Sequence, residues 1–285
     1  MSRVLPATQT AEELLRRQNG DGGWGYKPSS SRTEPTALAT AALTNHGVSP
    51  GRSMEWLVRR QRSDGGWAPG DVVDQSTWVT SLVLLTPGLP AESHKRGLEW
   101  LLNLTSRESS RLERLRRFLV GSRLEAGEGT TGWPFFPGTA GWVTPTSMAI
   151  VALRAAATLY PNDARISDRI DAGHQFLLAR ACPDGGWNHG SSRSLGYDLS
   201  SYPETTGQAL LALRGYASPV VSKAVLCAER HLARAESVEA AVWLRLGLMA
   251  HGRRMINTCP PARGTLDLIL RLILERAEEG ANVFV

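Results

Sequence analysis

One short phrase recurs along the chain and constrains its fold more than any other feature. The phrase reads GDGGWG at 20–25, SDGGW at 63–67 and PDGGWN at 183–188, and a looser version, TGWPFFPG, lies at 131–138. Aspartate and paired glycines end a helix and turn the chain, because glycine adopts positive φ without a Cβ clash and aspartate accepts bonds from nearby amides. An internal repeat of this kind predicts stacked helical hairpins that form a solenoid or a closed ring.

The stretches around the phrases predict two layers of helices. Those before a turn, such as RSMEWLVRRQ at 52–61 and GLEWLLNLT at 97–105, are amphipathic and are expected in an outer layer. Those after a turn are small and apolar on nearly every face, which predicts an inner layer buried on all sides. We expect the segment 266–277 to be a last outer helix, which leaves the inner layer one helix short or filled by another segment.

The sequence therefore predicts an all-α protein, an α/α toroid of roughly six helical hairpins in a single domain over 1–285. One insertion, at about 106–131, interrupts the repeat. Its centre, RLERLRRFLV, places leucines on one face and arginines on the other. Such a basic amphipathic helix fits either the interface of a membrane or an ordinary solvated surface.

Composition narrows the class of protein. The chain is 42% hydrophobic and 21% charged, with a net charge of +5 and a pI near 9.4. The positive net charge suits an anionic partner, such as a membrane surface or a diphosphate, but it is equally typical of an arginine-rich soluble protein. We expect no nucleic-acid partner. We find no apolar run long enough to span a membrane and no secretory signal, so a cytoplasmic protein with optional peripheral membrane contact is expected. The oligomeric state is left open.

The repeat resembles a known motif. Gln18 to Trp24 and Gln61 to Trp67 both read Q-x-x-x-G-x-W, and two further copies lack the glutamine but keep the tryptophan, at Trp133 and Trp187. This pattern is similar to the QW motif of the squalene–hopene and oxidosqualene cyclases, and the β subunits of protein prenyltransferases share the same hairpin toroid. The resemblance implies an α/α toroid in which these six residues are structural.

Carboxylates at the predicted starts of the inner helices are the candidate catalytic groups. The cyclases carry D-x-D-D-T-A at such a start, and the resemblance places its proton-donating central acid on Glu34 of RTEPTA. The same register places Asp74 and Glu204 at equivalent positions in their repeats. The flanking acids are missing, because Arg32 and Pro35 occupy their places. Acidic residues are also common helix starters without any catalytic role.

We expect no metal and no other cofactor. The prenyltransferases bind zinc with D-x-C at an inner-helix start, where this chain reads Asp74-Gln-Ser76. The cysteines lack CxxC spacing, the histidines show no pairing among themselves, and Cys227 is expected to lie far from any carboxylate.

Aromatic side chains near the predicted inner-helix starts are candidate substrate contacts, because aromatic faces stabilise carbocations. They are Trp78, Phe135, Trp142, Tyr202 and Trp243. Three functions remain open: a terpene-cyclase-like enzyme acting on a linear isoprenoid, a catalytically silent toroid that binds an isoprenoid or lipid, and a protein-interaction scaffold. A zinc prenyltransferase subunit is the least favoured alternative.

Overall fold

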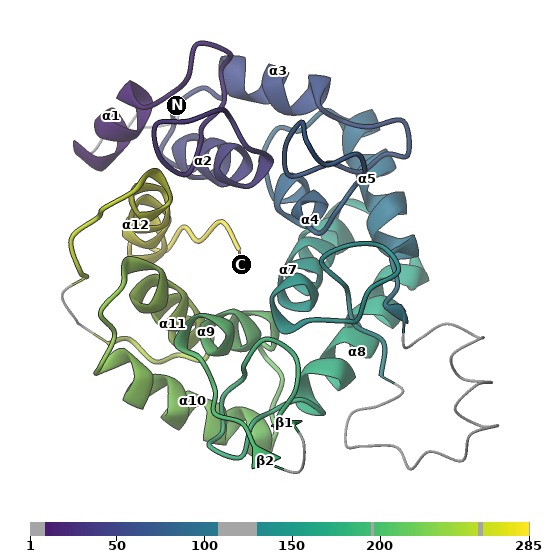
Figure 1. Cartoon of the computed structure of the whole chain (residues 1–285), viewed down its shortest axis with the longest axis vertical. Helices are drawn as coiled ribbons and strands as arrows, with labels where there is room; N and C mark the ends of the chain where they lie inside the picture. The colour runs from purple at the N-terminus through teal and green to yellow at the C-terminus, as the bar shows by residue number, and fades with distance from the viewer. Residues whose placement is uncertain (1–8, 108–129, 195–196, 256–258, 285) are drawn as a thin grey trace.

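The computed structural model describes residues 9–107, 130–194, 197–255 and 259–284, which form a ring of helices in two layers (Figure 1). The inner helices are α2 (Thr33–Asn45), α4 (Val79–Leu84), α7 (Val143–Leu159), α9 (Pro203–Ala212), α11 (Val238–Ala250) and α12 (Thr265–Glu278). The outer helices are α1 (Gln9–Arg16), α3 (Gly51–Arg59), α5 (Ala91–Asn103), α8 (Ala164–Leu178) and α10 (Pro219–Leu232). A two-stranded hairpin, β1 (Arg193–Ser194) with β2 (Tyr197–Asp198), lies in the connection between α8 and α9. The predicted α/α toroid is confirmed.

Each repeat tryptophan fastens its turn to both layers of the ring. The fully buried Trp67 donates its indole N–H to the carbonyl of Leu57, near the end of outer helix α3, at 2.7 Å. Its backbone N–H donates to the Thr80 hydroxyl on inner helix α4 at 2.9 Å. Trp24, Trp133 and Trp187 make the same two kinds of bond. The tryptophan thus ties consecutive helices together at the point where the chain reverses.

The aspartate and glutamine of the phrase hold the turn itself. In the first repeat, Asp21 accepts hydrogen bonds from the Gly23 amide at 3.0 Å and from the Ser31 hydroxyl at 2.7 Å. Gln18 donates its side-chain amide to the carbonyl of Gly22 at 2.8 Å, and Gln61 makes the equivalent bond to Gly65. Every polar part of the phrase therefore satisfies a backbone group of a sharp turn.

Glycine is required at the second position of the DGG phrase. Gly22 and Gly65 have φ values of +96° and +94°. A Cβ on Gly65 would also lie 2.5 Å from the carbonyl oxygen of Arg96 on the next outer helix. The turn therefore needs both the positive φ and the close approach that only glycine permits.

The second inner helix does not begin where the sequence pattern placed it. The tryptophan amides bond to Thr36, Thr80, Thr146 and Thr206, so these threonines are equivalent. The sequence register instead matched Thr36 with Ser76, four residues too early. Ser76 serves the preceding turn, where its hydroxyl donates to Asp64 at 2.7 Å. The residue equivalent to Glu34 is consequently Trp78 rather than Asp74.

The last helix was assigned to the wrong layer. Helix α12 packs between α11 and α2 and completes an inner layer of six helices among the described residues (Figure 1). Helix α1 covers it from outside. The position without a described helix is in the outer layer, where 251–255 and 259–264 pass as irregular chain.

The chain ends inside the ring. The tail after α12 reaches the centre of the view in Figure 1, and the Asn45 side chain at the end of α2 donates to the Ala281 carbonyl at 2.8 Å. Phe284 packs on Trp243 with ring centroids 5.4 Å apart. The tail therefore passes the carboxyl end of α2 and reaches Trp243 in the wall of the ring.

The predicted amphipathic insertion at 106–131 lies almost entirely outside the described residues, which resume at 130. Within the described part of the chain, none of the helices combines the length and the apolar character that crossing a membrane requires.

Candidate functional site

The six inner helices surround a cavity of about 320 Å³. Each helix start contributes a pair of lining residues spaced i and i+4, so the wall has two layers. The upper layer, at the amino ends of the helices, consists of Glu34, Trp78, Thr144, Glu204, Glu239 and Leu266. The layer one turn deeper consists of Leu38, Leu82, Met148, Gln208, Trp243 and Leu270. Residues four apart lie on the same face of a helix, so both members of each pair face the cavity.

The upper layer is acidic, because three of its six positions are glutamates. Glu34, Glu204 and Glu239 stand in the first turns of α2, α9 and α11. Amino ends of helices carry partial positive charge, which favours carboxylates at this mouth of the ring. The deeper layer is mostly apolar, and Gln208, its polar member, accepts a hydrogen bond from Thr144 at 2.7 Å. The cavity therefore combines carboxyl groups at the mouth with an apolar interior.

Glu239 is an acid whose pKa the surrounding side chains raise. Burial, followed by the negative charges of Glu204 and Glu34, raises the pKa of Glu239 to about 7. Each ionised carboxylate disfavours ionisation of its neighbours, so the group as a whole holds a proton near neutral pH. Glu239 is thereby able to act as a general acid under physiological conditions.

Glu34 also has a raised pKa, which burial causes and a hydrogen bond partly opposes. The phenol of Tyr26, from the loop between α1 and α2, donates that bond to Glu34 Oε2. Burial, followed by the negative charge of Glu34 and the hydrogen bond to it, raises the pKa of Tyr26 as well, so the phenol stays protonated. Tyr26 thus fixes the orientation of Glu34 at the mouth.

A run of aromatic rings follows the rim from α4 to α9. Trp78 meets Phe135 edge to face at 5.5 Å, and Phe135 lies 5.9 Å from Trp142. Trp142 then approaches His189 at 6.3 Å, and His189 lies 5.0 Å from Tyr202. Of the five aromatic residues expected to contact substrate, Trp78 and Trp243 line the cavity. Phe135, Trp142 and Tyr202 form the adjoining rim.

The structure separates the three carboxylates selected from the sequence. Glu34 and Glu204 line the cavity. Asp74 lies outside it, with a side chain that is 99% exposed and paired with Arg62 at 2.8 Å. Its sequence neighbour Asp71 pairs with Arg60 instead of with Asp74. The four-residue error in the register of α4 explains the misplacement of Asp74.

Sequence reasoning missed Glu239. The inner helix that carries it begins after Ser237, whose side chain caps α11 by accepting from the Ala240 amide. This helix has Ala241 where α2, α4, α7 and α9 have threonine, so the acid-x-threonine pattern did not mark it. The available signal was the spacing of Glu239 to Trp243, four residues deeper on the same face.

Comparison with known proteins adds evidence on the fold. No protein-family model matches the sequence, and no curated protein matches it. Solved structures do match. A GH8 endo-beta-1,4-glucanase from an Achatina fulica gut metagenomic library superposes with a TM-score of 0.61 at 14% identity, covering 98% of this chain and 100% of the glucanase.

This chain has the fold of an α/α toroid. A protein from Actinoplanes gives a TM-score of 0.53 at 17% identity, covering 95% of this chain and 79% of the other. The type II terpene cyclase MstE from Scytonema, solved with its substrate geranylgeranyl dihydroxybenzoate, gives 0.42 at 14% identity, covering 94% and 96%. Identities this low describe architecture alone, so function has to be argued from the cavity.

Proposed function

We propose that the central cavity binds an uncharged linear isoprenoid and that Glu239 donates a proton to it, which starts a cyclisation of the terpene-cyclase type. The observation that carries the proposal is the two-layer wall, in which a layer with three glutamates stands directly above an apolar layer. Glu34 and Glu204 support Glu239 by keeping its proton in place near neutral pH.

The shape and lining of the cavity favour an apolar ligand. Its volume of about 320 Å³ is at the small end of the range for small-molecule sites, roughly 300–1,000 Å³. Leucine and methionine side chains cover most of the deeper wall, and a polyene would bury its chain against them. Trp78 and Trp243 face the same space, where their π-electrons would stabilise a developing carbocation.

Charge argues against a diphosphate substrate. Among the described residues that line the cavity, three are glutamates and one is a histidine, His189, but none is a lysine or arginine. A diphosphate would enter beside these carboxyls without a lysine or arginine to balance its charge, which is costly in a partly buried site. A polysaccharide, the substrate class of the glucanase with the similar fold, would meet few polar partners on the Leu38, Leu82 and Leu270 wall.

The pKa of the acid favours an activated substrate. A carboxyl with a pKa of about 7 is about half protonated at neutral pH and is a weaker acid than an ordinary carboxyl. An epoxide oxygen or a double bond conjugated to an electron donor accepts a proton more readily than an isolated alkene. Substrates with such an end group are therefore expected to react first.

Binding without catalysis is the second candidate, and one feature favours it. Pro35 and Arg32 flank Glu34 where cyclases have further acids, so the strongly acidic cluster of that family is missing at this helix start. The same cavity would then hold an isoprenoid without changing it.

Product analysis separates these functions. The protein is incubated with squalene, squalene epoxide, farnesol, geranylgeraniol and the two corresponding diphosphates, and extracts are examined by gas chromatography with mass spectrometry. We expect cyclic products from an uncharged substrate, strongest with the epoxide, and none from the diphosphates. Glu239→Gln should reduce product formation by roughly 100-fold or more, because it removes a general acid.

Asp74→Asn is the matched control, since it removes a carboxylate outside the cavity and should leave product formation unchanged. Loss of product in Asp74→Asn with retention in Glu239→Gln would overturn the assignment of the acid. Saturable binding of an uncharged isoprenoid without any product would establish the binding function instead.

A further inference from the structure

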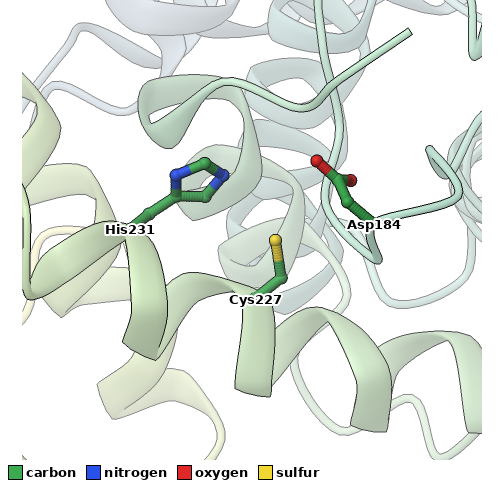
Figure 2. Close-up of side chains that lie close together, drawn as sticks. All are labelled: Asp184, Cys227 and His231. Carbon is green, nitrogen blue, oxygen red and sulfur yellow. The ribbon is translucent and has the colours of Figure 1, made fainter.

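A second group of reactive side chains lies on the outer wall of the ring, away from the lining of the central cavity. Asp184 belongs to the third DGGW turn, and Cys227 and His231 stand one helical turn apart on α10 (Figure 2). One ligand atom from each, a carboxylate oxygen, a thiol sulfur and an imidazole nitrogen, lie within 4.8 Å of one another. The sequence argument expected Cys227 to be far from any carboxylate, and the structure corrects this.

The repeat shows that the fold does not require a thiol and an imidazole at the positions of Cys227 and His231 on the outer helix. Gly22, Gly65 and Gly185 each lie against the backbone of Arg52, Arg96 or Lys223 on the following outer helix, so those three helix positions are equivalent. Four residues further along they are followed by Trp56, Trp100 and Cys227. The two earlier repeats therefore carry tryptophan where the later one carries a thiol.

The function of that tryptophan is visible in the first repeat. Trp56 donates its indole N–H to Asp21 Oδ2 at 3.0 Å, and Arg60, one turn further along, lies over its ring. The corresponding residues at the later turn are Cys227 and His231. The later turn therefore has a thiol and an imidazole, two side chains that can coordinate a metal, where the first repeat has a large donor and a cation.

We propose that Asp184, Cys227 and His231 bind a zinc ion. A thiolate, an imidazole and a carboxylate together form a donor set that zinc prefers. Ligand atoms at roughly 2.0–2.3 Å from a tetrahedral zinc stand about 3.3–3.8 Å apart, so the widest pair closes by about 1 Å through side-chain rotation. The i,i+4 spacing of the two α10 ligands fixes both on one face of a regular helix.

Ser201 marks the centre of the group. Its hydroxyl lies 2.8 Å from His231 Nε2, 2.9 Å from Asp184 Oδ2 and 3.5 Å from Cys227 Sγ. These three contacts show that the ligand atoms converge on one point that a small polar atom can reach. Ser201 Oγ or a water molecule would supply the fourth ligand of a tetrahedral site.

The three proposed ligands come from two separate parts of the chain. Asp184 belongs to the turn after α8, whereas Cys227 and His231 belong to the outer helix α10. Zinc would then fasten the turn that precedes α9, and so the connection that leads to the cavity mouth, to the outer helix α10.

Cobalt(II) tests the site directly, because cobalt bound to a thiolate gives a near-ultraviolet charge-transfer band that oxygen and nitrogen ligands do not give. Full-length protein with its affinity tag removed is stripped with a chelator, titrated with cobalt and then with zinc. We expect the band to saturate at one cobalt per chain and to disappear as zinc displaces it. Saturable cobalt binding without the band, or no binding, would overturn the proposal.

Variants identify the ligands. Cys227→Ser should abolish the band, His231→Gln should weaken binding on the order of 100-fold or more, and Cys182→Ser, which removes a buried cysteine outside the group, should keep both. The double variant Cys227→Trp with His231→Arg restores the pair found at Trp56 and Arg60, so it should fold and bind no cobalt. A band that survives in either Cys227 variant, or that is lost only in Cys182→Ser, would refute the assignment.

Discussion

The second glycine of the repeat turn should be far more costly to replace than another glycine with the same backbone conformation. Gly65 has φ +94°, and a Cβ there would lie 2.5 Å from the Arg96 carbonyl oxygen. Gly47, after inner helix α2, has φ +78°, and a Cβ there would meet nothing within 4 Å. Gly65→Ala and Gly47→Ala therefore differ mainly in the close approach of the next outer helix.

The expected magnitudes follow from these two terms. A non-glycine residue in the left-handed region costs roughly 1–2 kcal/mol, offset by about 0.4–1 kcal/mol because alanine restricts the unfolded chain. Gly47→Ala should therefore cost about 1 kcal/mol. Gly65→Ala adds a steric overlap with backbone, for which about 1–3 kcal/mol is typical, giving a total near 3 kcal/mol.

Thermal and urea unfolding followed by circular dichroism measure both variants. At about 2–4 °C per kcal/mol for a large domain, Tm should fall by about 3 °C in Gly47→Ala and by about 6–12 °C in Gly65→Ala. Equal decreases, or a larger decrease in Gly47→Ala, would refute the argument that packing of the next helix, in addition to φ, dictates the DGGW phrase.

Three further changes test the other parts of the account. Glu239→Gln should raise Tm at pH 8 and raise it much less at pH 5. The folded-state pKa of about 7 lies above the usual value of 4.5, so ionisation of Glu239 increasingly favours the unfolded chain as the pH rises between these values, and thermal scans at both pH values decide this. Trp67→Phe should lower the free energy of unfolding by about 3 kcal/mol, because the smaller ring leaves a cavity in the core and the Leu57 carbonyl loses its hydrogen-bond donor. Urea titration measures this change. Tyr26→Phe should raise the pKa of Glu34 further, because it removes the hydrogen bond that stabilises the carboxylate. Carbon-13 NMR of the labelled Glu34 carboxyl follows the titration, and an unchanged or lower pKa would contradict the role of Tyr26.

The turn phrase was sufficient to predict the ring, because its residues act locally. Gln61 bonds to Gly65, four residues further along, and the indole of Trp67 bonds to Leu57 on the helix just before it, so the spacing of the phrase in sequence reflects these local contacts. The register of α4 was not predictable in the same way. Asp74 and Ser76 look like helix starters, yet Ser76 supports the turn and the helix begins at Val79.

Other parts of the site depend on contacts between distant segments, which leave a weaker trace in the sequence. Glu239 acquires its unusual pKa from Glu34 and Glu204 on other helices, and only closure of the ring brings the three together. The group around Cys227 had a local signal, the i,i+4 spacing to His231, but its carboxylate comes from a turn more than one helix earlier. Long-range partners of this kind cannot be inferred from periodicity.

The most direct test of the central proposal is a crystal structure of the protein with an uncharged isoprenoid such as farnesol. The account predicts density for the ligand within the inner ring, with its chain between Trp78 and Trp243 and its hydroxyl within hydrogen-bond distance of Glu239. Density only at another surface, or a cavity filled by side chains under saturating ligand, would contradict it.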